Sequence, residues 1–351
     1  MAFFFKPYRA DTIGLITTYR CPFSCRHCLY CSSPQREDEI SNEALSTIIS
    51  EASLALGEAG VHIGGGEPLL NEHMVEYAVK ALNKTRLVLE YLETNGFPLR
   101  IDTEGRLQRL KAMGIPMLLL SISPFHNEFI SAHEVERIFH SIIKVFGYEG
   151  IFPWHPGYFP FLRRVDPERP VPLEEYFGAF SPQEIRLQLE SLIYLHPSGR
   201  AAYFFARYLP TFRAEHFFRH PCGEALKSPV HVHVDYRGAY LPGFCAGLSL
   251  GEGAAFQLEK LYGEGIDLAL YPVLELIVRE GLEGLYRHGL SQGYEPIAGG
   301  YVSACHLCID LRIHLYNGGY RGAELYPRFF YDELSHQSLA ARIGKASESL
   351  S

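Results

Sequence analysis

The sequence lacks the features that mark membrane, secreted and nucleic-acid-coating proteins. No apolar run approaches the roughly 18–20 residues that a membrane span needs, and no basic leader precedes a long apolar stretch at the N-terminus. Positive charge is in deficit, because 32 Lys and Arg against 40 Asp and Glu give a net charge of −8. A protein that coats nucleic acid or an anionic membrane carries a basic surface instead. We therefore expect a cytoplasmic protein that binds neither nucleic acid nor a membrane.

Internal repeats and low-complexity tracts are absent as well, whereas hydrophobic residues make up 47% of the 351 residues and allow a sizeable core. The chain also has eight cysteines, and their spacing is uneven. In a long acidic chain without a leader, clustered cysteines indicate metal binding or redox chemistry rather than disulfides. The alternative is a set of ordinary buried thiols. The cysteines form two groups, at positions 21, 25, 28 and 31 and at positions 222, 245, 305 and 308.

Strands and helices alternate over the first 150 residues. This rhythm is typical of a parallel sheet covered by helices, the α/β class. The strand predictions fall at 12–18, 61–63, 87–92, 117–123 and 151–152, and the helix predictions at 42–56, 71–81, 107–113 and 132–146. Three strands end in polar or glycine-rich segments, at 64–68, 94–96 and 121–123. In βα barrels the working groups lie at the C-terminal strand ends, so we expect these segments to meet at one opening.

The rhythm ends near residue 152. Residues 152–175 are rich in proline and aromatic residues and are predicted to form an ordered loop, followed by a helix at 182–194. Residues 231–245 read as a β-hairpin with its turn at Arg237 and Gly238. A helix is predicted to begin near Cys305.

The first cysteine group suits an iron–sulfur cluster. Three thiolates on a loop directly after a strand can hold three irons of a 4Fe–4S cluster and leave the fourth iron open to a substrate or cofactor. The motif Cys21-Pro22-Phe23-Ser24-Cys25-Arg26-His27-Cys28 resembles the signature loop of the radical S-adenosylmethionine (radical SAM) superfamily. Gly64-Gly65-Gly66-Glu67-Pro68 resembles the GGEP element of the same family. The resemblance covers residues 12 to about 150 and implies a partial (β/α)6 TIM barrel.

The resemblance also implies roles for individual residues. Cys21, Cys25 and Cys28 would ligate the catalytic cluster, and the amine and carboxylate of SAM would complete the fourth iron. The expected SAM-binding residues are His27 beside the adenine, Gly65, Gly66, Glu67 and Pro68 at the methionyl amine, and Thr94, Asn95, Ser121 and Ser123 at the ribose or carboxylate. Many relatives have an acidic residue in the strand-end motif at 121–123, which is absent here.

Three further residues are weaker candidates. Cys31 is not needed as a cluster ligand and is either a small buried residue or a thiol available for redox chemistry or hydrogen donation. His126 and His155 are candidates for polar contacts with the substrate, and both are also common as structural histidines.

Cys222, Cys245, Cys305 and Cys308 form the second group. Four thiolates are what a closed 4Fe–4S cluster or a structural zinc site requires. A cysteine, a hairpin with glycine, a second cysteine and a distal C-x2-C resemble the SPASM and twitch extensions of radical SAM enzymes. The resemblance implies one auxiliary 4Fe–4S cluster, with zinc and unligated core cysteines as alternatives. The implied C-terminal extension consists of a β-hairpin plus helices.

The predicted organisation is therefore a barrel domain at 1–215, with an aromatic-rich insertion at about 152–180, and an auxiliary-cluster domain at 216–351. The predicted activity is reductive cleavage of SAM to a 5′-deoxyadenosyl radical, which abstracts a hydrogen from a peptide or protein side chain for oxidation, crosslinking or epimerisation. A small metabolite as substrate remains an alternative, as does a non-catalytic Fe–S or zinc electron carrier or scaffold. Such an enzyme would need a reductant such as flavodoxin or ferredoxin.

Overall fold

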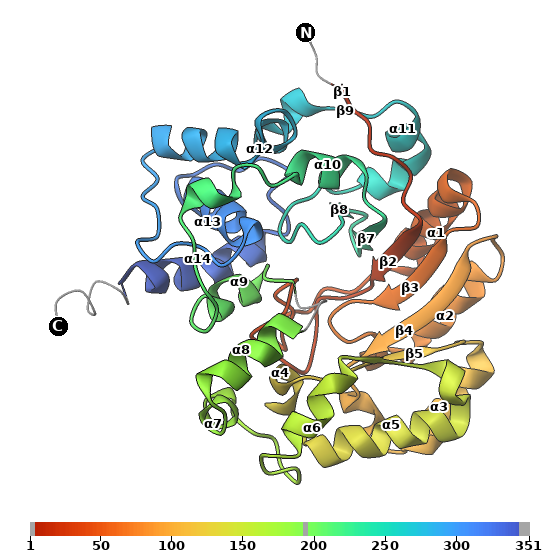
Figure 1. Ribbon diagram of the computed structural model, residues 1–351. Helices are drawn as coiled ribbons and strands as arrows, with labels where there is room; N and C mark the ends of the chain where they lie inside the picture. The colour runs from red at the N-terminus through yellow and green to blue at the C-terminus, as the bar shows by residue number, and fades with distance from the viewer. Residues whose placement is uncertain (1–3, 192–195, 344–351) are drawn as a thin grey trace.

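The centre of the structure is a seven-stranded sheet in the order β6-β5-β4-β3-β2-β7-β8 (Figure 1). The computed structural model describes residues 4–191 and 196–343. All neighbouring strands run parallel except β8, which pairs antiparallel with β7. The strands are β2 (Thr12–Ile16), β3 (Gly60–Gly64), β4 (Val88–Thr94), β5 (Leu118–Ser121), β6 (Ile151–Trp154), β7 (His231–Asp235) and β8 (Tyr240–Pro242). A separate short pair joins β1 (Phe4–Phe5) to β9 (Ile266–Asp267).

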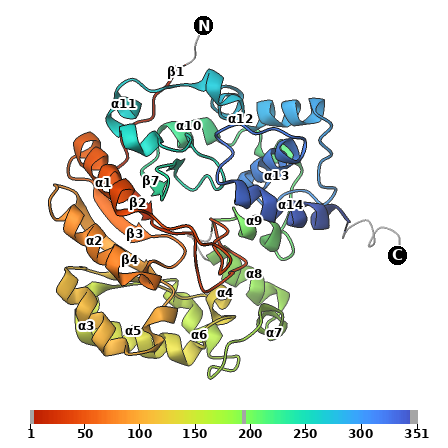
Figure 2. The ribbon, with the colours of Figure 1, turned by 180° about the vertical axis from the view of Figure 1, so that it is seen from behind.

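Four long helices follow the strands of the N-terminal half and lie along the outer side of the sheet (Figures 1 and 2). They are α1 (Asn42–Leu56), α2 (Glu72–Leu82), α3 (Thr103–Met113) and α5 (Ala132–Phe146). Side chains of Ser41, Asn71 and Ser131 accept hydrogen bonds from backbone N–H groups of the first turns and fix three of the helix starts. The predicted α/β class and its helix-covered parallel sheet are confirmed.

The two faces of the sheet differ in character. Successive side chains of a strand point to opposite faces, and on β2 and β3 the buried apolar residues Ile13, Leu15, Val61 and Ile63 belong to the core. Of the alternate positions, Thr12 and His62 line a cavity, whereas Ile16 packs in a second, smaller cluster of buried residues. The opposite face of these two strands is therefore open to the cavity at part of its length.

The sixth parallel strand comes from the C-terminal third of the chain. The predicted hairpin exists, with Gly238 in its turn at φ 68°, and its first strand β7 pairs with β2 over the whole length of both strands. Pairing protects the edge of β2, which would otherwise be exposed. The domain boundary between residues 215 and 216 stays a prediction. Strand β7 lies in the predicted auxiliary-cluster domain and nevertheless joins the sheet of the barrel.

The region 152–180 is more regular than the predicted loop. It contains the end of β6 and the short helices α6 (Phe159–Leu162) and α7 (Leu173–Gly178), because its aromatic side chains, Tyr158 and Tyr176 among them, are buried in the core. The loop prediction was therefore wrong for these segments. The predicted helix at 182–194 corresponds to α8 (Pro182–Ser191), and its last predicted residues lie outside the described ones.

The remaining described α-helices are α4, directly after β5, and six helices of the C-terminal half. They are α4 (Pro124–Asn127), α9 (Arg200–Phe205), α10 (Cys222–Lys227), α11 (Leu258–Gly263), α12 (Pro272–Ser291), α13 (Ala304–Asn317) and α14 (Arg328–Ile343). Within the described ranges, no helix combines the length and the apolar character needed to cross a membrane.

Candidate functional site

The predicted strand-end residues meet in one cavity of about 480 Å³. Its walls come from the cysteine loop after β2, from the inward faces of β2 to β5 and from the C-terminal third. The predicted site residues that line it are Cys21, Cys25, His27, Cys28, Gly65, Gly66, Thr94, Asn95, Ser121 and His126. Glu67, Pro68, Ser123, Cys31 and His155 are not among the lining residues.

Two glycines of the GGGEP segment let it pack directly against the cysteine loop. The amide of Gly66 donates to the carbonyl oxygen of Thr18 over 2.6 Å, and the amide of Glu67 donates to that of Arg20 over 2.9 Å. A Cβ atom at Gly66 would lie 2.1 Å from the Arg20 carbonyl oxygen, and one at Gly65, whose φ is +143°, would lie 2.6 Å from that of Thr18. Only glycine permits this approach, so the motif fixes the position of the cysteine loop.

Glu67 is fully buried and its carboxylate is already engaged. It accepts hydrogen bonds from the Asn95 amide at 2.8 Å, the Leu69 amide at 3.1 Å and the Thr94 hydroxyl. Burial raises the pKa of Glu67 to about 7, although these donors lower it. The carboxylate therefore ties the ends of β3 and β4 together. The resemblance implied a direct contact between Glu67 and the SAM amine, and that role stays a prediction.

Asn95 connects the end of β4 to the cysteine loop. Its side-chain amide donates to the Sγ of Cys21 over 3.4 Å, and its Oδ1 accepts from the amide of Phe97. Burial raises the pKa of the Cys21 and Cys25 thiols, and Glu67 adds to the rise at Cys21. A bound metal would offset this cost by stabilising the thiolates.

His27 stacks on Phe125 with a ring-centroid distance of 4.6 Å, and its buried Nδ1 has no hydrogen-bond partner among the described residues. Burial lowers its pKa well below the ordinary histidine value, so the ring is neutral. Next to it, His126 shares a 2.7 Å hydrogen bond with Ser123, and burial lowers the pKa of His126 to about 3. Ser123 thus positions His126 instead of facing the cavity.

Two weaker candidates lie away from the cavity. Cys31 is fully buried at a positive φ of 56°, and burial raises the pKa of its thiol. His155 is buried near His126 and His27, and burial lowers its pKa to about 4. Both placements suit structural residues better than substrate-contacting ones.

Arg200 is a residue of the site that sequence reasoning missed. From the first turn of α9 it donates to the carbonyl oxygens of Cys25 at 3.1 Å and Ser32 at 3.0 Å, and it pairs with Glu333 of α14. A Cβ at the preceding Gly199 would lie 2.6 Å from the Cys28 carbonyl oxygen. No local motif signals these contacts, because Arg200 and Ser32 are 168 residues apart in the chain.

The second cysteine group also comes together. Cys222 opens α10, Cys245 follows β8, and Cys305 and Cys308 lie in the first turns of α13. Each of Cys222, Cys245 and Cys305 has its pKa raised by burial and by neighbouring thiols of the group. The buried Arg312 of α13 counteracts this rise at all three thiols. His196 Nε2 lies 3.1 Å from the Cys305 Sγ, and His220 Nδ1 lies 3.3 Å from the Cys222 Sγ.

A helix-covered parallel sheet with a three-cysteine loop and a glycine-rich strand end at one opening defines a cofactor-dependent α/β barrel protein. Residues 15–147 match the model of the radical SAM superfamily. Domains of this family hold a 4Fe–4S cluster and SAM, and the three thiols and neighbouring glycines of the cavity fit that pair.

Curated relatives match over part of their length. PqqA peptide cyclase of Rhizobium meliloti (strain 1021) is 33% identical over 125 residues, which are 34% of this chain and 30% of the relative. GTP 3′,8-cyclase of Helicobacter pylori (strain J99 / ATCC 700824) is 27% identical over 120 residues, 34% of this chain and 36% of the relative. The chain thus spans about a third of the length of the curated relatives it matches.

Two solved structures are also similar. Native anSMEcpe with bound AdoMet has a TM-score of 0.44 at 14% identity, and the match covers 97% of this chain and 98% of that structure's chain. BtrN in complex with AdoMet and 2-DOIA has a TM-score of 0.40 at 14% identity, over 79% of this chain and 90% of its own.

Proposed function

We propose that the protein is a radical SAM enzyme that abstracts a hydrogen atom from an unactivated C–H bond of a peptide or protein. The observation that carries this proposal is the shared cavity of Cys21, Cys25 and Cys28 with Gly65 and Gly66. An electron carrier has no use for a SAM-binding strand edge beside its cluster. When bound, the cluster and SAM supply reductive cleavage of the S–C5′ bond and a 5′-deoxyadenosyl radical.

The chain's own residues bind and orient in this proposal. Cys21, Cys25 and Cys28 hold three irons, and Asn95 donates to one of the three sulfurs. Gly65 and Gly66 provide the backbone edge for the methionyl group, with Glu67 and Pro68 holding that edge in place. His27 lies beside the adenine with its unpartnered Nδ1, and Thr94 and Ser121 act near the ribose or carboxylate. Ser123 contributes by holding His126 through their hydrogen bond. Rigid placement of one C–H bond against C5′ is the main contribution that such a protein makes.

A peptide substrate is supported by the walls of the cavity and by one relative. His196, which follows α8, and Phe244, which follows β8, line the cavity together with the barrel residues, so a substrate can be held between these segments and the barrel. One relative that is similar to part of this chain is a PqqA peptide cyclase. Of the described side chains at 152–160, none lines the cavity, so this segment is no part of the proposed substrate site. The reductant remains the predicted flavodoxin or ferredoxin.

We further propose that Cys222, Cys245, Cys305 and Cys308 hold a second 4Fe–4S cluster. A single tetrahedral zinc with Zn–S bonds of about 2.3 Å needs sulfurs roughly 3.8 Å apart. Among the described residues, no three of these four thiols lie within 4.8 Å of one another. Their wider spacing favours the larger four-iron cluster.

Anaerobic reconstitution with iron, sulfide, SAM and a strong reductant tests the activity. We expect 5′-deoxyadenosine from the wild-type protein and none from Cys21→Ala, Cys25→Ala or Cys28→Ala. Cys31→Ala is the matched control from the same loop and should still form it. Absence of 5′-deoxyadenosine from a wild-type protein with its full iron content would contradict the enzyme proposal. Peptides are then incubated with the wild-type protein or with Cys28→Ala, and mass spectrometry measures their loss of hydrogen. A loss with the wild-type protein alone indicates a peptide substrate, and no loss with either protein favours a metabolite.

A further inference from the structure

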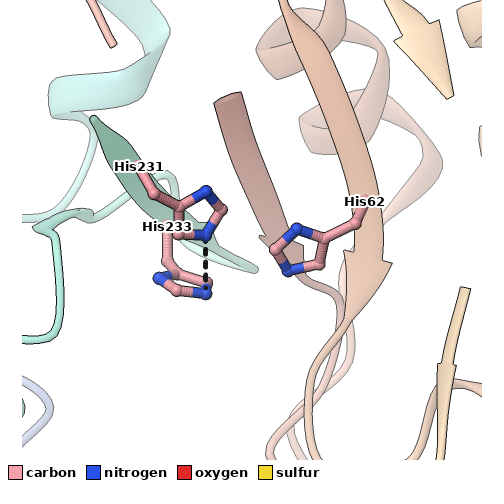
Figure 3. Close-up of side chains that lie close together, drawn as sticks. All are labelled: His62, His231 and His233. Carbon is pink, nitrogen blue, oxygen red and sulfur yellow. Dashed lines mark hydrogen bonds between the residues drawn. The ribbon is translucent and has the colours of Figure 1, made fainter. Parts of the chain in front are cut away.

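Three histidines that the proposed radical chemistry does not use lie together on the cavity side of the sheet (Figure 3). His62 comes from β3, and His231 and His233 come from β7. One possible ligand atom from each lies within 4.8 Å of those of the other two. Within residues 4–191 and 196–343, no other group of three or more His, Cys, Asp or Glu side chains meets this limit.

The sheet register produces this cluster. Strand β2 lies between β3 and β7, and Gly14 of β2 pairs with His62 on one side and with His233 on the other. The two rings therefore meet above Gly14. A Cβ atom there would lie 2.5 Å from both rings, so the missing side chain supplies the space that the imidazoles occupy. His231, two residues before His233, faces the same side because strand side chains alternate.

Two of the ring nitrogens lie at the separation that two ligands of one metal ion would have. His231 Nδ1 lies 2.6 Å from the Thr12 hydroxyl, which leaves Nε2 of His231 to face Nε2 of His233 over 3.2 Å. Two nitrogens at this distance share either a proton or a cation. Ligands of a tetrahedral ion with metal–nitrogen bonds of about 2.0–2.1 Å are separated by roughly 3.4 Å. A hydroxyl or carbonyl partner on the second ring nitrogen is the usual support of a metal-bound histidine.

The surroundings favour neutral rings with unused ligand capacity. His62 is 3% and His233 7% exposed, and the Nδ1 atom of His62 lacks a hydrogen-bond partner among the described residues. The Nε2 atom of His62 lies 3.4 Å from the Glu93 carboxylate. Burial lowers the pKa of both histidines well below the ordinary value and that of His231 to about 4. Neutral imidazole is the form that binds metal.

We propose that His62, His231 and His233 bind one divalent transition cation of the zinc type. Three imidazoles leave at least one coordination position for water or a substrate atom, as in catalytic zinc sites. All three rings line the cavity that also holds Cys21, Cys25 and Cys28, so a substrate donor atom on the ion would share the chamber with the proposed SAM site. The ion would act there as a Lewis acid that binds a carboxylate, thiolate or carbonyl oxygen. This site does not depend on the proposed radical activity.

Zinc binding to the cluster-loaded protein tests the proposal. The protein is reconstituted anaerobically, stripped of loosely bound metal, supplied with zinc and desalted, and iron and zinc are measured together. We expect about one zinc per chain with nitrogen or oxygen neighbours at about 2.0–2.1 Å in X-ray absorption, and no sulfur at about 2.3 Å. His62→Gln and His233→Gln should lose this zinc at unchanged iron content. His140→Gln, an exposed histidine on α5, is the matched control and should retain it.

Two further variants separate metal binding from a general loss of structure. Thr12→Val removes the hydroxyl at His231 Nδ1 and should weaken zinc affinity by about 10–100-fold, with recovery in Thr12→Ser. Gly14→Ala should abolish zinc binding while iron loading persists. The proposal is overturned if the wild-type protein retains no zinc, which would leave a hydrogen-bonded histidine cluster. A sulfur shell, or equal zinc in His62→Gln and the wild type, overturns it as well.

Discussion

The guanidinium of Arg200 donates to the backbone carbonyl oxygen of Cys25 over 3.1 Å. Through this contact and the ion pair with Glu333, helices α9 and α14 of the C-terminal half hold the cysteine loop of the barrel. Glu333 also pairs with Arg36 of the same loop at 2.9 Å. The geometry of the proposed cluster site thus depends on residues far away in the sequence.

Replacing Arg200 should loosen this loop. Arg200→Met keeps most of the side-chain length but leaves the carbonyl oxygen of Ser32 without its buried donor, whereas that of Cys25 still accepts from the Cys28 amide. An unsatisfied buried group of this kind costs about 1–3 kcal/mol, so the unfolding midpoint should fall clearly. Iron bound by Cys21, Cys25 and Cys28 should decrease in parallel. Arg186→Met, which removes an exposed ion pair on α8, is the control, and an equal midpoint in both variants would refute the role of Arg200.

The hydrogen bond from Asn95 to the Cys21 sulfur should tune the proposed cluster. Asn95→Asp keeps the Oδ1 acceptor for Phe97 but replaces the donor with a carboxylate. The loss of a hydrogen bond to the thiolate and the added negative charge both disfavour the reduced cluster. We expect a more negative reduction potential in an EPR-monitored redox titration. Asn71→Asp at the start of α2 should leave the potential unchanged, and an unshifted potential in Asn95→Asp would contradict the prediction.

Glu67 should make stability depend on pH. Burial raises its pKa from the ordinary 4.5 to about 7 in the folded chain, so the folded state binds this proton more tightly than the unfolded state does. Stability is therefore lost as the pH rises through this interval and levels off above about pH 7. Glu67→Gln removes the ionisation. The fall in unfolding midpoint between about pH 5 and about pH 8 should be smaller in Glu67→Gln than in the wild type. An identical fall in both proteins would show that Glu67 does not titrate in this range.

The second cysteine group should account for half of the iron. The reconstituted wild-type protein should hold about eight irons per chain, and Cys305→Ala should hold about four. Cys31→Ala should keep about eight, because it belongs to neither proposed ligand set. About four irons in the wild type, with zinc bound by sulfur, would favour the zinc alternative.

The sequence alone could predict what depends on local chemistry and periodicity. The strand–helix rhythm predicted α1, α2 and α5 within one or two residues, and the residues Arg237 and Gly238 located the hairpin turn. Short-range spacing likewise defined the Cys21–Cys28 motif. These features follow from interactions between residues close in the chain, which a single sequence records directly.

The tertiary structure decided which distant segments meet. Strand β7 was predicted as part of a hairpin, but only the fold pairs it with β2 and brings His231 to Thr12 across 219 residues. Arg200 reaches Cys25 in the same way. Such contacts arise from burial and strand pairing over the whole chain, which no local pattern encodes. The sequence thus determined the chemistry of the cysteine loop, and the fold determined that three histidines share its cavity.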